Sequence, residues 1–535
     1  MTLDKSGNVY NIGNFKGTVD VDPGPGVTNL SAAGAEDVFV TKMDPNGNLL
    51  WALRIGGTDT ENANAITVDA AGNAYITGFF KSPSVDMDPG AGTATMTLSG
   101  TSDAFILKLD AAGKFTWAKQ LGGGSAELSP YAISTDAAGN VYTAGSFSAT
   151  ADFNPGAGTG NMTCKSTYYE SYISKLDASG NYVWAKQLEG DDFNGIAFMK
   201  VDGPGNVYAM GVFEKNIDAD PGTGVRTMTT AGLADVFVLK LDASGNMQWS
   251  TKVGGTEPDW PRGLALDPAG DVIVTGTFDS RADFDPYGAG YVLKSIGSSP
   301  GPDIFILKLG NDGKFGWARQ LGAGGTGGVE STLGVATDAK GKIYLAGNFS
   351  GTMDMDPGPG ASYLVSAGSS DIFISVLNGS GEYDWAGVLK GATIASVGNA
   401  NGVAVDAYGE QIYTTGNFYG KIKADPAGGS ELDEGSGSTF VHKLAASVTA
   451  IPGAQVASLL QLQPNPCSET LRVMAGQPLQ HARISISDMS GRMIALYPDV
   501  SGTYQEIDMH DFPAGMYLLE LSANGSTMHA RLMRP

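Results

Sequence analysis

The segment Asp136-Ala-Ala-Gly-Asn-Val-Tyr-Thr-Ala-Gly-Ser-Phe147 decides the fold, because its pattern recurs along most of the chain. Its first residue has counterparts at intervals of 65 to 71 residues, namely Asp4, Asp69, Asp202, Asp267, Asp338 and Asp406. Its last residue recurs as Phe15, Phe80, Phe213, Phe278, Phe349 and Phe418. Seven copies of a unit of this length indicate an array of equivalent structural units.

Each unit contains four short runs of alternating apolar and polar residues. Two of them flank the aspartate turn, and a second pair follows after about twenty residues, as in Asp103–Asp110 and the run around Trp117. The equivalent tryptophans are Trp51, Trp184, Trp249, Trp317 and Trp385. Period-two patterning between Gly, Asp and Asn turns predicts four β-strands in each unit.

These strands predict an all-β seven-bladed β-propeller over residues 1–446. A four-stranded sheet cannot bury both faces alone, so we expect the recurring Phe and Trp to form the core between neighbouring blades. The seventh unit ends near Leu444 without a tryptophan strand, and the first begins just before Asp4, so both end blades are predicted to be incomplete. We expect an upstream segment carrying a signal peptide and the missing tryptophan strand; the alternative is an intact chain with a three-stranded last blade.

Composition and charge exclude several classes of partner and site. The formal net charge of −23 disfavours nucleic acid and anionic lipid, and no stretch of about 20 apolar residues predicts a membrane span. The two cysteines, Cys164 and Cys467, cannot build a disulfide framework or a cysteine metal site. The four histidines all lie at or beyond His442, so no catalytic triad or histidine zinc site is predicted in the propeller, and no cofactor.

A D-x-D-P-G element recurs in the first six units, with departures from the pattern in the third and the fifth. Its pairs are Asp20 and Asp22, Asp86 and Asp88, Asp152 with Asn154, Asp218 and Asp220, Asp283 and Asp285, and Asp354 and Asp356, while the seventh unit has Lys423 and Asp425. Two carboxylates side by side invite either hydrogen bonds from turn amides or a hard cation such as Ca²⁺. We favour amide-capped turns, and Ca²⁺ binding is the alternative.

Stretches that differ between the repeats are the remaining place for specificity. Trp260 is the one tryptophan outside the repeat position, and Arg262 follows two residues later. The pair could stack on a sugar or peptide, or Trp260 could anchor a loop. Two functions therefore remain open: a non-catalytic binding, adhesion or scaffold module with a glycan or protein ligand, and a polysaccharide hydrolase with carboxylates at one mouth of the propeller.

The last part of the chain has a different pattern. A linker over 447–455 precedes residues 456–535, where short alternating runs are separated by Gly and Pro turns. This pattern predicts a small antiparallel, immunoglobulin-like β-sandwich.

Both parts resemble known families. The pattern D-A-x-G-N-V-Y-x-x-G-x-F, followed by D-x-F-I-x-K-L-D-x-x-G-x-x-x-W, resembles bacterial SBBP propeller repeats, which implies an extracellular propeller and no particular reaction. The C-terminal part resembles the type A sorting domain of the type IX secretion system through Pro464, Asn465, Pro466, Asp488, Gly491, Arg492, Gly515 and Tyr517. That resemblance implies recognition by the secretion machinery and a final location outside a Gram-negative cell or on its outer membrane.

Overall fold

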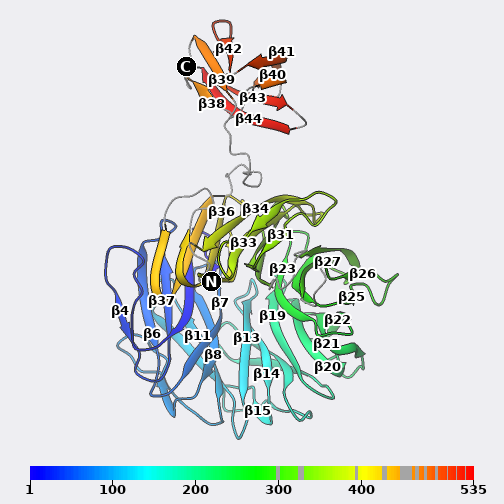
Figure 1. The fold of residues 1–535 in the computed structure, drawn as a ribbon. Coiled ribbons are helices and arrows are strands. Elements are labelled where there is room, and N and C mark those ends of the chain that lie inside the picture. Colours follow the sequence, from blue (N-terminus) through cyan, green and yellow to red (C-terminus); the bar gives the residue numbers. More distant parts are fainter. Residues whose placement is uncertain are drawn as a thin grey trace. The chain divides into compact units, whose positions relative to one another are not determined.

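The computed structural model describes residues 1–296, 302–322, 331–391, 396–423, 431–445, 461–463, 469–474, 479–488, 492–502, 504–513, 515–523 and 526–534. Every regular element within these ranges is a β-strand, which confirms the all-β prediction (Figure 1). The chain divides into two compact units, Met1–Ala450 and Ile451–Pro535. The predicted linker, residues 447–455, lies outside the described residues.

The first unit consists of consecutive antiparallel sheets, which we call blades one to seven, each with its strands in chain order from the inner to the outer edge. Blade one contains β1 (Thr2–Leu3), β2 (Val9–Phe15), β5 (Asp37–Met43) and β6 (Leu49–Ile55), and blade two contains β7 (Glu61–Val68), β8 (Ala74–Phe80), β11 (Asp103–Leu109) and β12 (Phe115–Leu121). Blade three contains β13 (Leu128–Thr135), β14 (Val141–Phe147), β17 (Glu170–Leu176) and β18 (Tyr182–Leu188), and blade four contains β19 (Asn194–Val201), β20 (Val207–Asp218), β21 (Thr227–Leu241) and β22 (Met247–Gly255). Blade five contains β23 (Trp260–Leu266), β24 (Val272–Phe278), β27 (Asp303–Leu309) and β28 (Phe315–Leu321), and blade six contains β29 (Ser331–Thr337), β30 (Ile343–Phe349), β33 (Asp371–Leu377) and β34 (Tyr383–Gly391). Blade seven contains β35 (Val397–Val405), β36 (Gln411–Lys423) and β37 (Glu431–Ala445) in the described part of the chain.

Small hairpins connect the second and third strands of most blades. They are β3 (Thr18–Asp20) with β4 (Asn29–Ser31), β9 (Ser84–Asp86) with β10 (Thr95–Thr97), β15 (Thr150–Asp152) with β16 (Asn161–Thr163), β25 (Arg281–Asp283) with β26 (Val292–Lys294), and β31 (Thr352–Asp354) with β32 (Tyr363–Val365). In blade four the long strands β20 and β21 continue into the equivalent hairpin.

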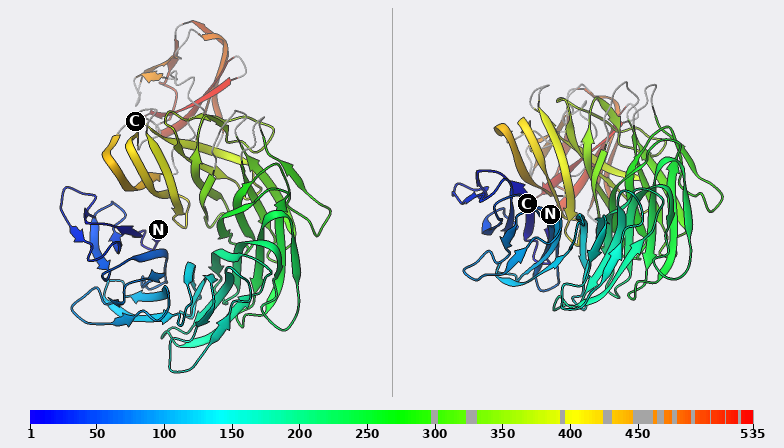
Figure 2. Two further views of the ribbon diagram at one scale, coloured as in Figure 1. Left: turned by 60° about the horizontal axis from the view of Figure 1, so that its bottom comes forward. Right: turned by 90° about the horizontal axis from the view of Figure 1, so that it is seen from below.

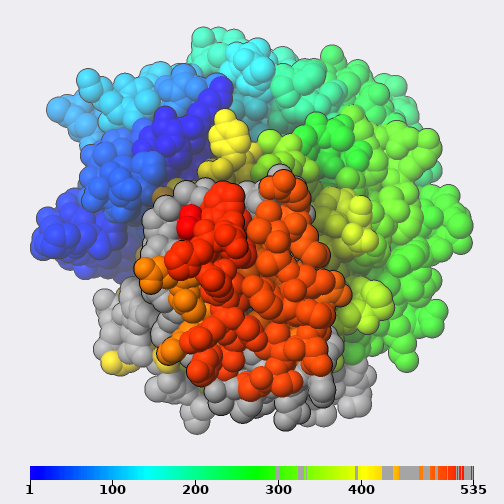
Figure 3. Space-filling view, turned by 90° about the horizontal axis from the view of Figure 1, so that it is seen from above, coloured from blue at the N-terminus to red at the C-terminus, as the bar shows by residue number. Residues whose placement is uncertain are grey.

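The blades follow one another around a central axis. Each inner strand contacts the next, in the order β1, β7, β13, β19, β23, β29 and β35, and β35 contacts β1 again. The left view of Figure 2 shows the sheets around this centre, and the space-filling view in Figure 3 shows the blades in chain order from blue through cyan to green. This arrangement is a β-propeller.

The recurring aromatic residues join neighbouring blades, as the sequence predicts. Six of the recurring phenylalanines are almost completely buried, and Phe15 is buried with slightly more exposure. Each tryptophan up to Trp317 lies against a turn glycine of the following blade, where an added Cβ would come within 2.5–3.4 Å of the indole ring; these glycines are Gly113, Gly180, Gly245, Gly313 and Gly381. The indole N–H of Trp249 also donates a hydrogen bond of 2.9 Å to the Asn311 carbonyl in that turn. The tryptophan side chains therefore pack each of these blades against the following one.

The second unit is a sandwich of two sheets. One sheet contains β38 (Gln461–Gln463), β39 (Thr470–Met474) and β42 (Gln505–Asp508). The other contains β41 (Met493–Gly502), β40 (Leu479–Asp488), β43 (Gly515–Ala523) and β44 (Ser526–Arg534). Leu471 and Ile507 from the first sheet share a fully buried core with Ile484 and Leu519 from the second, which is the packing expected of a β-sandwich.

Candidate functional site

A β-bulge interrupts each inner strand from blade two to blade seven. The register against the second strand shifts around one extra residue, and the six extra residues are Asn64, Tyr131, Ala197, Arg262, Leu333 and Asn401. A bulged residue has no partner on the neighbouring strand, and bulges commonly re-aim a side chain at a functional site. Because the inner strands surround the axis, these six residues form a set around it, which we call the bulge ring.

The glycine of the G-x-F motif explains why every bulge lies at the same place. A Cβ on Gly78 would lie 1.8 Å from the carbonyl oxygen of Asn62, on the inner strand just before the bulge. The equivalent distance is 2.0–2.4 Å at Gly145, Gly211, Gly276 and Gly347, and 1.9 Å at Gly416. Only glycine leaves room for such a close approach of two backbones. The sequence analysis missed the bulges, and the signal that could have revealed them was a glycine inside each second strand.

The bulge ring combines a repeated backbone with side chains of different chemistry. The Tyr131 side chain is 47% exposed, and Asn401 is also exposed. The Asn64 amide donates a 2.7 Å hydrogen bond to the Pro130 carbonyl on the next inner strand. Hydrogen-bonding groups held on a rigid sheet scaffold are typical of binding sites.

Arg262 belongs to this ring, and Trp260 opens the same strand. The Arg262 guanidinium is partly buried, and its Nε has no hydrogen-bond partner among the described residues. Burial lowers the pKa of the Arg262 guanidinium from its usual value. The Trp260 side chain is 42% exposed at the start of β23. Arginine and tryptophan are residue types that supply cationic and aromatic contacts to ligands, and here they are two residues apart at the start of one inner strand.

The D-x-D-P-G pairs cap their own hairpins. The carboxylate of the first residue accepts two backbone hydrogen bonds, one from the N–H of the second residue of the pair and one from the residue eight positions after the first. Asp86 Oδ1, for example, accepts from the Asp88 N–H at 3.0 Å and from the Ala94 N–H at 2.8 Å. The same two bonds occur at Asp20, Asp152, Asp218, Asp283 and Asp354. The second residue accepts a further turn N–H, as in Asp88 with Gly90. In the seventh unit Lys423 ends β36, and Asp425 lies outside the described residues.

These hydrogen bonds lead to a prediction about Ca²⁺. The described residues contain no group of three or more His, Cys, Asp or Glu side chains arranged to hold a metal ion. We therefore expect the thermal midpoint of the propeller to move by less than about 2 °C between excess Ca²⁺ and excess chelator, because an ion that binds only the folded state raises stability. Tryptophan fluorescence follows this unit selectively, since all seven tryptophans lie within Met1–Ala450. A rise of several degrees with Ca²⁺ would instead support a bound ion.

Acidic residues at the start of the inner strands accept hydrogen bonds from backbone N–H groups of nearby loops. Asp259 is fully buried, and its Oδ2 accepts a 2.8 Å hydrogen bond from the Gly255 N–H. Burial, together with the nearby charges of Asp235 and Asp279, raises the pKa of Asp259 to about 8. Glu61 has the same position in blade two and accepts from the Gly57 and Ser82 N–H groups. A raised pKa is common in catalytic acids, but a carboxyl group buried to this extent has no access to a polysaccharide.

Three of the predicted sorting residues, Asp488, Gly515 and Tyr517, lie around the start of one strand in the second unit. Asp488 ends β40 and pairs in register with Tyr517 of β43, the strand that Gly515 begins. Tyr517 is buried, its ring lies 5.5 Å from that of Phe512, and its hydroxyl donates to the Pro513 carbonyl. Pro464, Asn465, Pro466 and Gly491 lie outside the described residues, and Arg492 directly precedes β41.

Comparison with family models finds a match within each of the two units. Residues 461–533 match the model described as a secretion system C-terminal sorting domain, and residues 116–146 match the model described as a β-propeller repeat, SBBP. The chain is an SBBP-type β-propeller with a type IX sorting domain. The matched propeller segment extends from β12 through β14 and includes the bulge at Tyr131. The sorting domain indicates a protein that is secreted or displayed at the outer surface. Within the described ranges, no helix has the length and apolar character needed to cross a bilayer.

Curated relatives of this propeller protein are distant. An uncharacterized WD repeat-containing protein of Acanthamoeba polyphaga mimivirus is 23% identical over 65% of this chain and 30% of that protein. The regulatory protein FlaEY of Caulobacter vibrioides is 24% identical over 49% of this chain and 27% of its own length. The chain thus spans less than a third of either relative.

Solved structures show only weak similarity. A protein from Lactobacillus plantarum has a TM-score of 0.31 and 11% identity, covering 76% of this chain and 95% of that one. A quinoprotein alcohol dehydrogenase-like protein from Bacteroides thetaiotaomicron has a TM-score of 0.25 and 10% identity, covering 83% and 96%. The propeller assignment therefore rests on the sheet topology and the repeat match.

Proposed function

We propose that the propeller is a non-catalytic binding module that the type IX machinery exports through the sorting domain, and that it binds a glycan or protein ligand at the bulge ring. The observation that carries this proposal is the bulge ring itself. The same backbone position is repeated six times, with asparagine, tyrosine, alanine, arginine, leucine and asparagine in turn. A repeated scaffold that presents different side chains at one level suits recognition of an irregular ligand.

The side chains of the ring suit a polar ligand. Tyr131 offers a flat apolar face with a hydroxyl group, and the two asparagines offer amide donors and acceptors. Arg262 supplies a fixed positive charge in a chain whose formal net charge is −23. Together these groups support binding of a hydroxyl-rich or acidic ligand, such as an anionic glycan or an acidic protein segment.

A hydrolase is the weaker alternative. Glycosidases need two accessible carboxyl groups about 5–10 Å apart on either side of the scissile bond. The carboxyl groups of Asp259 and Glu61 instead receive hydrogen bonds from loop backbone. Binding without turnover is therefore the function that the geometry favours.

The test is a glycan array combined with a panel of glycosidase substrates, both applied to the full chain. For a ligand retained on the array, we expect Tyr131→Ser and Arg262→Gln each to reduce affinity at least tenfold, about 1.4 kcal/mol, because each removes one direct contact. Tyr363→Ser, at a tyrosine that is 60% exposed on β32, is the matched control and should bind normally. Unchanged binding by both ring variants would remove the ring as the site, and release of sugar products would favour the hydrolase.

A further inference from the structure

Asp259 links the connection between blades four and five to the outer strands of blade four. Its Oδ2 accepts a 2.8 Å hydrogen bond from the Gly255 N–H at the end of β22. Its own N–H donates a 2.9 Å hydrogen bond to the Ala234 carbonyl of β21. Trp260, the next residue, begins β23. The two hydrogen bonds therefore hold the connection, residues 256–259, and with it the start of β23, against blade four.

The Asp259 carboxyl group has no positive partner. It is fully buried, and its Oδ1 has no hydrogen-bond partner among the described residues. In the same part of the chain no cationic side chain forms an ion pair with it, and the Lys252 ammonium of β22 pairs with Asp235 Oδ2 at 2.7 Å. That oxygen of Asp235 also accepts the Ala231 N–H. These contacts stabilise a charge on Asp235, whereas nothing comparable stabilises a charge on Asp259.

The charged groups that act most strongly on Asp259 are acidic. Asp235 lies on β21, and Asp279 directly follows β24. Burial, together with these two negative charges, raises the pKa of Asp259 to about 8. On the elements around it, the remaining charged residues are Glu257 in the connection, Arg262 on β23 and Arg281 on β25.

Unused acceptors around Asp259 support the same protonation state. In three other blades, a glycine at or just after the end of the outer strand donates its N–H to the acid that corresponds to Asp235; the pairs are Gly123 with Asp103, Gly190 with Glu170, and Gly391 with Asp371. In blade four the equivalent Gly255 N–H donates to Asp259. Asp235 Oδ1 and Asp279 Oδ1 are both buried without a partner among the described residues. A proton on Asp259 Oδ1 adds one donor to a region with too many acceptors.

We propose that Asp259 is a neutral acid in the closed junction seen in this structure, and that loss of its proton opens residues 256–259 and frees the start of β23. An ionised Asp259 would be buried beside two further carboxyl groups, whereas water solvates it in the open form. Trp260 and Arg262 lie on the freed strand, so the proton acts on the part of the bulge ring that carries Arg262. The proposal does not depend on which ligand the ring binds.

The direction of the pH dependence follows from the two forms of the junction. The pKa of Asp259 is about 8 in the closed form, and in the open form it is close to the usual aspartate value of about 4. Opening therefore releases a proton, so a rise in pH between about 4 and 8 favours the open form. Over this range the ratio of open to closed molecules increases about tenfold per pH unit. Burial also raises the pKa of Asp303 in blade five, to about 6, so the range above pH 6 reports mainly on Asp259.

Hydrogen exchange of the full chain, read by mass spectrometry on peptides that cover residues 254–266, measures the opening. After correction for the intrinsic exchange rate at each pH, we expect the opening equilibrium to increase about tenfold from pH 6 to pH 7. Asp259→Asn keeps an acceptor for the Gly255 N–H but cannot ionise. This variant should lose the increase, and at pH 7 its amides should be protected at least tenfold better than those of the wild type.

Asp312→Asn is the matched control, because it makes the same chemical change at an exposed turn of blade five. The Lys314 ammonium holds the pKa of Asp312 below its usual value, so this carboxylate stays ionised from pH 6 to pH 7 in both forms of the junction. The control should keep the wild-type increase.

Two results would overturn the proposal. The first is a corrected opening equilibrium in the wild type that does not change between pH 6 and pH 7. The second is an undiminished increase in Asp259→Asn, which would assign the titration to another group, such as Asp303. The first result needs no variant, so it decides the question even if Asp259→Asn does not fold.

Discussion

Replacing Phe213 by alanine is expected to lower the free energy of unfolding of the propeller by about 3–5 kcal/mol, the range measured for buried Phe-to-Ala changes. Phe213 is fully buried, and its ring lies 6.2 Å from that of Phe237 in an edge-to-face arrangement. Both rings share a core with Ile196 of the inner strand and Tyr142 of the preceding blade. The substitution therefore leaves a cavity between two blades.

Denaturant unfolding followed by tryptophan fluorescence measures this loss, because every tryptophan of the chain reports on the propeller. Tyr363→Ala is the control, since its side chain is 60% exposed and the change should cost less than about 0.5 kcal/mol. A loss below about 1 kcal/mol for Phe213→Ala would mean that the junction collapses around the missing ring.

The second large effect is expected at Gly313. Its φ is +80°, and an added Cβ would lie 2.5 Å from the indole of Trp249. Alanine here should cost about 1–2 kcal/mol for the left-handed backbone and about 1–3 kcal/mol more for displacing the indole. Gly47→Ala is a matched control in the equivalent turn, because its φ is +86° and no described atom lies within 4 Å of the new methyl group.

The difference between these two glycine variants isolates the contact with tryptophan. The backbone cost is common to both, so we expect Gly313→Ala to be less stable than Gly47→Ala by about 1–3 kcal/mol. Urea midpoints of the two proteins, compared under identical conditions, give this value. Equal losses would show that the indole moves aside without cost, and the tryptophan would then not hold the blades together.

Much of the propeller can be predicted from the sequence because the same residue pattern recurs in each repeat. The aspartate turns, the buried phenylalanines and the tryptophan positions recur at fixed places, and the phenylalanines are buried in all seven blades, whereas the tryptophan contact with a turn glycine recurs from Trp51 to Trp317. The D-x-D-P-G pairs also have the amide-capped geometry that the sequence analysis favoured, as Asp86 shows with the N–H groups of Asp88 and Ala94.

The bulge ring could not be derived in the same way. Alternating patterns place side chains on faces of a strand, but a bulge shifts that alternation by one residue. Whether Tyr131 or Pro130 takes the extra position depends on where Gly145 of the neighbouring strand lets the backbone approach. Arg262 was singled out only because it follows an unusual tryptophan, and its place in the ring comes from tertiary structure.

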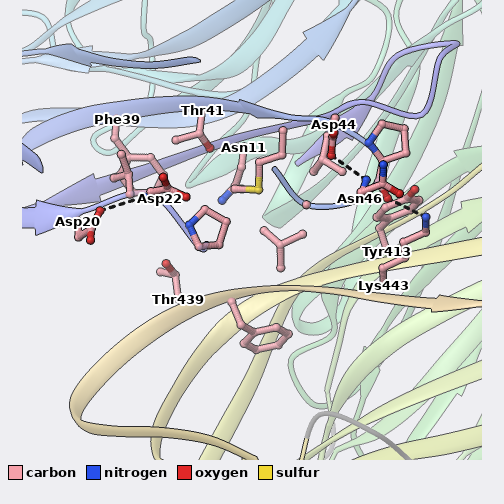
Figure 4. A pocket seen from close by; sticks show the side chains of 18 of the residues that line it. Asn11, Asp20, Asp22, Phe39, Thr41, Asp44, Asn46, Tyr413, Thr439 and Lys443 are labelled. Atoms are coloured by element: carbon pink, nitrogen blue, oxygen red, sulfur yellow. Dashed lines mark hydrogen bonds between the residues drawn. The ribbon is translucent and has the colours of Figure 1, made fainter. Parts of the chain in front are cut away.

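The junction between blades seven and one could be predicted only in part. The absence of a tryptophan from the seventh unit can be counted in the sequence. That Gly47, Lys443 and Tyr413 line one pocket at this junction (Figure 4) requires the folded structure, because these residues come from opposite ends of the propeller.

The bulges also divide two tasks between different residues. The glycine of the second strand specifies that the inner strand bulges, whereas the bulged side chain takes no part in strand pairing. One residue in each of blades two to seven can thus change without disturbing register. A combinatorial library that randomises Asn64, Tyr131, Ala197, Arg262, Leu333 and Asn401 would sample many chemical surfaces on a single unchanged backbone, much as antibodies vary loops on a common framework.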